Sequence, residues 1–144
     1  MTAYTTCAGY IIQRLDTNWN KVQTPVVYDN EQYVPAENSN FMYFSVNFVD
    51  ATQASLYNLN GSTEDRLFRY TGVIEANIFT SLNEGPGEGF TLADTLSNIY
   101  RGRTFNNVTC FTPRVMSGRQ QKFGEGKWWS TPVFIGFQYD QRMA

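Results

Sequence analysis

The sequence predicts an α+β domain in which two helices pack on one face of a mostly antiparallel sheet, in the order α-β-β-β-α-β-β. Apolar residues recur at helical spacing in only two segments, and they alternate with polar residues in the long segments between and after them. Strands that follow one another directly favour antiparallel pairing. At 144 residues the chain fits a single domain covering residues 1–144.

The first predicted helix covers residues 4–18. Its apolar positions follow the spacing of one helix face, with polar side chains opposite. These positions are Ala8, Ile11, Ile12 and Leu15. A short extended piece at 26–28 follows Pro25, because proline favours extended backbone in the residue before it and ends helices.

Two long strands are predicted next, at 41–50 and 66–82. In the first, Met42 and Phe44 share a face and Phe41 and Tyr43 share the other. In the second, Gly72 interrupts the core face, which predicts a bulge or a close approach of two backbones. We expect residues 50–65 between them to form a long loop or the tip of an extended hairpin.

The second predicted helix covers residues 91–101, with Leu92, Leu96 and either Ile99 or Tyr100 facing inward. Thr91 and Asp94 fit a capping box loosely, and Gly102 is placed to end the helix. The glycine-rich segment 85–89 before it stands where a phosphate loop would stand. It lacks the Lys-Ser/Thr pair of such loops, so a plain strand-to-helix turn is the better interpretation.

The last third predicts a pair of strands, at 105–116 and 128–140, joined by a polar turn at 117–127. In the closing strand, Trp129 and Val133 fall on the core face, which turns Trp128 and Phe134 outward. A sheet that is apolar on both faces is usually covered on both, and two helices cannot cover two faces. Either the sheet curls on itself or another subunit covers it.

Charge is divided unevenly along the chain, although the net charge is only −2. Two basic and seven acidic residues precede Arg66, whereas nine basic and six acidic residues occur from Arg66 onward. This division is expected either to scatter over a solvated surface or to give an acidic face that meets a neighbour's basic face. We do not expect direct nucleic-acid binding, because the chain as a whole is not basic.

The sequence offers little for catalysis. It contains no histidine, which removes the commonest general base and metal ligand, so we expect no enzyme, no metal and no cofactor. Cys7 and Cys110 are expected to be free buried thiols of a cytoplasmic protein. The apolar stretches are too short to span a membrane, so no membrane partner is expected.

The C-terminal half carries a family pattern. It consists of FTLADTL at 90–96, Arg103 and Phe105, FTP at 111–113, a glycine-rich turn, GKWW at 126–129 and VFIGFQYD at 133–140. This pattern resembles the tail-terminator (tail-completion) proteins of long-tailed bacteriophages, and the order of elements agrees over nearly the whole chain. The resemblance implies a virion protein, assembled in the host cytoplasm, that caps the tail tube as a six-membered ring and joins the tail to the head.

The partners that the resemblance implies are further copies of the chain, the tail-tube protein and a head-completion or connector protein. Candidate interface residues combine the outward aromatic residues with the basic residues of the second half. They are Arg69, Arg101, Arg103, Arg114, Arg119, Trp128 and Phe134. Two alternatives stay open: another connector or tail-tube protein, and a cone-shaped domain whose aromatic residues bind a small molecule.

Overall fold

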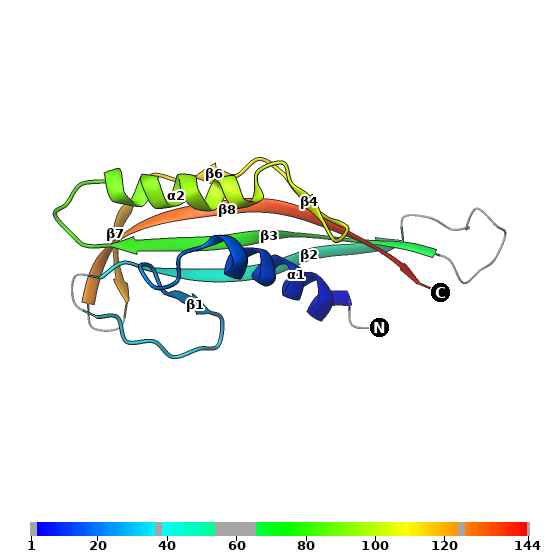
Figure 1. Ribbon diagram of the computed structural model, residues 1–144, viewed down its shortest axis with the longest axis horizontal. Helices are drawn as coiled ribbons and strands as arrows, with labels where there is room; N and C mark the ends of the chain where they lie inside the picture. Colours follow the sequence, from blue (N-terminus) through cyan, green and yellow to red (C-terminus); the bar gives the residue numbers. More distant parts are fainter. Residues whose placement is uncertain (1–2, 37–38, 54–65, 124–125, 144) are drawn as a thin grey trace.

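The computed structural model describes residues 3–36, 39–53, 66–123 and 126–143. Its two layers are one curved sheet and two helices, α1 (Ala3–Asn18) and α2 (Gly87–Tyr100), that lie on the same side of it (Figure 1). The α+β class, the mostly antiparallel sheet and the order of helices and strands are therefore as predicted.

Three long strands form the centre of the sheet: β2 (Phe41–Gln53), β3 (Arg66–Thr80) and β8 (Gly126–Met143). Strand β3 pairs antiparallel with both neighbours, and its register with β8 runs unbroken from Arg66 opposite Met143 to Thr80 opposite Trp129. The short β1 (Val26–Tyr28) pairs parallel with β2 at one edge. Residues 51–53, expected in a long loop or the tip of an extended hairpin, extend β2 and pair with β3, and 54–65 lie outside the described residues.

The helix α1 packs against the sheet through residues spaced four apart: Ala3, Cys7, Ile11 and Leu15 are buried. Of the predicted face, Ala8 and Ile12 are only half-buried. Residues four apart lie on the same side of a helix, so this series still forms one apolar stripe. The stripe belongs to the main core together with Phe44, Ile74 and Ile135.

The helix α2 begins at Gly87, four residues earlier than predicted, and includes most of the glycine-rich segment. The predicted capping box is absent: Pro86 caps the helix without a side-chain bond, and the Thr91 hydroxyl donates instead to the Gly87 carbonyl. The close approach of α2 to β8 explains Gly89, since a Cβ there would lie 2.3 Å from the Thr131 hydroxyl oxygen. Gly102 follows the helix with φ of +60°, which glycine adopts without strain.

Gly72 marks both a close approach and an adjacent bulge. A Cβ at this position would lie 2.2 Å from the Asn47 carbonyl oxygen and 2.6 Å from the Phe137 ring. Directly beside it, the register of β2 against β3 shifts between Phe48 and Asp50, so that Val49 is the extra residue of a β-bulge. The missing side chain therefore makes room for the Phe137 ring in the core.

The chain between α2 and β8 is more divided than the two predicted arms. It forms β4 (Thr104–Phe105), β5 (Val108–Cys110), β6 (Arg114–Val115) and β7 (Arg119–Phe123). Strands β5, β6 and β7 pair in turn with successive parts of the outer edge of β8. The prediction of a polar turn at 117–127 was wrong, because β7 occupies five of these residues and β8 begins at Gly126. Its polar sequence suits an edge strand, where only one side is paired.

Candidate interaction surface

The face of the sheet turned away from the helices is only partly covered by the residues that the structure describes. Along β3 and β8 the side chains on this open face include Val73 and Phe134, which are half-buried, and Glu75, which is exposed. Phe111, between β5 and β6, is 50% exposed and lies over Gly136 on the same face. The predicted outward position of Phe134 is thus confirmed.

A salt bridge occupies one end of the open face. The Arg69 Nε donates to the Asp140 Oδ1 over 2.9 Å and its Nη2 donates to Oδ2 over 3.2 Å. Such a two-bond fork fixes both side chains in one geometry. Arg69, a candidate interface residue, is therefore held by a partner within its own chain.

An aromatic cluster covers the opposite end of the open face. Phe41 stacks on Phe79 at 4.6 Å, and the Trp128 ring meets Phe41 edge-on at 5.1 Å. Trp128 is on the face that alternation predicted but is only 7% exposed, so its role as an outward interface residue is corrected. The cause is packing by other segments: Tyr33 and Phe123 pack against the cluster. Trp129, predicted to be core, is half-buried beside Gly118.

The segment that carries Tyr33 is fastened to the open face through Asp29. Its carboxylate accepts hydrogen bonds from the Tyr43 hydroxyl and, over 2.7 Å, from the Ser45 hydroxyl. The bond from Tyr43 to Asp29 raises the pKa of the phenol. Neither partner of Asp29 is near it in sequence, so periodicity gave no indication that residues after β1 would return over the sheet.

Basic side chains line the edge of the sheet formed by β4, β5, β6 and β7. All of these side chains are exposed, and no acidic residue occurs anywhere from 101 to 123. The set comprises Arg101, Arg103, Arg114, Arg119 and Lys122. Four of the candidate interface residues are therefore spread along this side of the molecule, from the end of α2 at Arg101 to β7 at Arg119.

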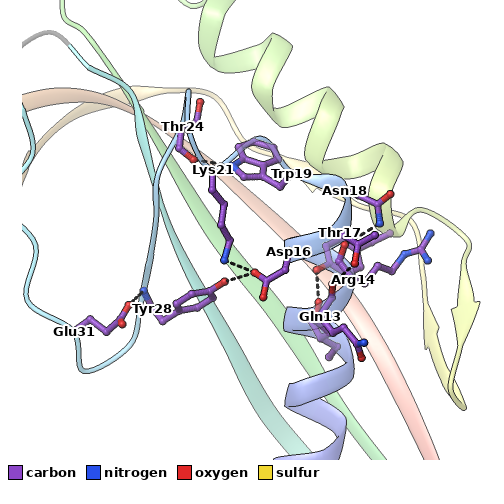
Figure 2. A network of polar contacts seen from close by, with 12 residues as sticks. Gln13, Arg14, Asp16, Thr17, Asn18, Trp19, Lys21, Thr24, Tyr28 and Glu31 are labelled. Atoms are coloured by element: carbon purple, nitrogen blue, oxygen red, sulfur yellow. Dashed lines mark hydrogen bonds and ion pairs between the residues drawn. The ribbon is translucent and has the colours of Figure 1, made fainter.

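Acidic side chains lie at the opposite edge, beside β1 and the outer side of β2. They are Asp16, Asp29, Glu31 and Asp50, all exposed. Figure 2 shows the part of this acidic edge where Asp16 accepts from Lys21 and from the Tyr28 hydroxyl, while Glu31 accepts from the Tyr28 backbone N–H over 2.8 Å. The hydrogen bond to Asp16 raises the pKa of Lys21.

Both cysteines are free and buried, as predicted. Burial raises the pKa of Cys7 to about 12 and that of Cys110 to about 12. Because the thiolate is the reactive form of cysteine, these thiols are unreactive at neutral pH.

The glycine-rich segment borders a hollow of about 220 Å³, lined by residues that include Asn83, Pro86 and Trp129. Ligand pockets usually measure at least about 300 Å³, and Glu88 in the first turn of α2 disfavours an anion there. Over the described ranges, no three Cys, Asp or Glu side chains gather in a way that would hold a metal ion. No helix in those ranges is long and apolar enough to cross a membrane.

Comparison with known proteins gives the fold and nothing on function. No protein-family model matches the sequence, and no curated protein matches it at a significant level. A solved protein structure whose name states no function superimposes on the chain with a TM-score of 0.62. The match covers 96% of both chains at 15% sequence identity. At that identity the likeness supports the α+β architecture alone.

Proposed function

We propose that this chain is a structural protein of a phage virion that caps the tail tube as a ring. In this role it stops tube polymerisation and provides the surface that joins the tail to the head. Its partners are further copies of itself, the tail-tube protein and a head-completion or connector protein. The role is one of assembly and requires no reaction and no cofactor.

The observation that carries the proposal is the open face of the sheet. The half-buried Val73 and Phe134 and the exposed Phe111 lie on it, away from both helices. Apolar side chains on the uncovered face of a sheet favour contact with another protein. The resemblance to tail terminators over residues 90–140, together with the order of elements expected from it, supports a neighbouring virion subunit as that protein.

Imaging of the purified protein tests this function. Negative-stain electron microscopy and light scattering over a range of concentrations are expected to show closed rings of about six copies, since heterologous contacts that close give rings. Rings are expected to form at lower protein concentration when tail tubes are added. A chain that stays monomeric at every concentration and does not bind tubes would contradict the proposal.

The same images separate a terminator from a tail-tube protein. A tube subunit polymerises, so it would give filaments whose length grows with concentration. A terminator stops at one closed ring, and its addition to growing tubes would shorten them. Filaments of the isolated chain would therefore assign it to the tube instead.

A further inference from the structure

The charge division along the sequence becomes a division between the two edges of the sheet. The acidic edge lies beside β1 and includes Glu31 and Asp50, whereas the basic edge lies beside β6 and β7 and includes Arg114 and Arg119. Strands β2, β3 and β8 separate the two edges, as the positions of β1 and β6 on opposite sides show (Figure 1). The tip of β7 curls over the open face, where the Phe123 ring lies 6.4 Å from that of Tyr33. Arg114 and Arg119 nevertheless form no ion pair with Glu31 or Asp50 within one copy.

Each edge combines its charge with exposed apolar side chains. On the basic edge, Val115 and Met116 stand next to Arg114 and are 37% and 43% exposed. On the acidic edge, Val49 stands next to Asp50 and is 72% exposed. Interfaces between proteins bury apolar side chains at their centre and place charges around them. Both edges thus have the composition of a contact surface, with opposite signs of charge.

Strand pairing covers only part of the acidic edge among the described residues. Strand β1 pairs with β2 only from Met42 to Phe44, and within the described ranges no strand pairs with the outer side of β2 beyond that point. The bulge at Val49 interrupts this outer side, which protects an edge against indiscriminate strand pairing. We therefore expect a partner to make its contacts here through side chains.

We propose that the basic edge of one copy of this chain docks on the acidic edge of the next copy. This inference rests on the proposed function and names the surfaces through which the ring forms. A second copy is the partner because it satisfies both edges at once, whereas a nucleic acid would cover only the basic one. Because the two surfaces lie on opposite sides of the subunit, the contact is heterologous and each copy has two neighbours.

A charge exchange tests the proposal. One variant reverses two charges of the basic edge with Arg114→Glu and Arg119→Glu, and the other reverses two charges of the acidic edge with Glu31→Lys and Asp50→Lys. Each variant alone places like charges opposite each other at the substituted positions and reduces the charge contrast between the edges, so the concentration for half-assembly should rise at least about tenfold. An equimolar mixture should restore rings, because the two variants then alternate with every contact complementary. Light scattering and negative-stain imaging measure both results.

A control separates edge charge from total charge. Glu84→Lys with Asp94→Lys changes the net charge as much as the acidic-edge variant does, but at exposed positions before and within α2. Its assembly should match that of the unaltered chain. Circular dichroism and thermal unfolding check that each variant folds. If a reversed variant folds poorly, the neutral variant Arg114→Gln with Arg119→Gln replaces it. Its rings should be less sensitive to salt than those of the unaltered chain, because fewer charges remain to be screened.

The outcomes distinguish the two proposals. Three results would each overturn the edge-to-edge contact. They are rings from either reversed variant at the normal concentration, failure of the mixture to assemble, and an unchanged salt dependence of the neutral variant. The ring itself would then form through another surface, and the proposed function would stand. An unaltered chain that never assembles would instead contradict the proposed function.

Discussion

The Tyr100 hydroxyl in α2 donates a buried hydrogen bond of 2.7 Å to the Ile11 carbonyl oxygen in α1. It joins the two helices across the layer that they form above the sheet. Tyr100 is fully buried, and its ring stacks near Phe44 at 6.3 Å. The residue therefore connects both helices and the sheet at one point.

Tyr100→Phe removes this bond and little else. Deleting one neutral hydrogen bond typically costs about 1 kcal/mol, and the aromatic packing is retained. We expect urea unfolding to show a loss of about 1 kcal/mol with an unchanged slope. Tyr10→Phe, on the half-buried side of α1, serves as the control and should change the free energy of unfolding by less. Equal losses in the two variants would contradict a specific contribution of the Tyr100 bond.

Alkaline pH should destabilise the fold, because its buried thiols and a buried phenol ionise more readily in the unfolded chain. Burial raises the pKa values of Cys7 and Cys110 to about 12 from 9.0, and it also raises that of Tyr100. Above pH 9 the unfolded chain loses these protons before the folded chain does, so unfolding releases protons and stability falls as pH rises. This stabilisation is fully present below pH 9 and is lost progressively toward pH 12.

The measurement is urea unfolding between pH 7 and pH 11. The Cys7→Ala, Cys110→Ala double variant should start less stable, because it leaves small cavities, and should lose less stability over this range. Parallel pH dependence in the variant and the unaltered chain would show that the thiols do not contribute.

Periodicity in the sequence predicted the long strands and the helices, and the face on which each of their side chains lies. The alternation in β2, β3 and β8 placed Met42 and Phe134 on the correct faces, because side chains along a strand point to alternate sides whatever the neighbours are. In α1 the apolar spacing placed Ile11 and Leu15 in the core, because residues three or four apart share one face of a helix. Trp128 was also placed on the correct face, yet its exposure was wrong.

Exposure depends on contacts between segments far apart in sequence. Tyr33 packs on Phe41, within the cluster that buries Trp128, from a segment without periodicity. Asp29 fastens that segment through Tyr43. The polar β7 gave no strand signal, since an edge strand need not bury either face. The acidic edge followed only from the strand order, which brings residues after β1 beside the outer side of β2. A charge imbalance was visible in the sequence, but its division between edges was not.

Gly72→Ala should destabilise the protein strongly. The new methyl group would meet the Asn47 carbonyl and the Phe137 ring, and Phe137 lies in the packed main core. Overpacking of this kind typically costs about 1–3 kcal/mol, and we expect the upper part of that range. Gly9→Ala is the matched control, because nothing lies within 4 Å of its Cβ position in α1.

The control Gly9→Ala should raise the free energy of unfolding, whereas Gly72→Ala should lower it. Alanine replaces glycine in a helix with a gain of roughly 0.5–1 kcal/mol. Thermal unfolding of the two variants measures both effects against the unaltered chain. Similar stability of the Gly72 and Gly9 variants would show that β3 can shift away from Phe137.

Trp128→Ala and Phe134→Ala separate folding from assembly on the same face of β8. Trp128 is enclosed by Phe41, Phe79 and Phe123, so its truncation should leave a cavity and cost about 3–5 kcal/mol of unfolding free energy. Phe134 is half-buried, so its truncation should cost about 1 kcal/mol and mainly weaken ring formation. Urea unfolding of dilute monomer and light scattering of concentrated protein measure the two effects separately. Unchanged monomer stability of the Trp128 variant would contradict the enclosure of Trp128 by the aromatic cluster. Normal rings from the Phe134 variant would show that the open face around Phe134 is not part of the assembly surface.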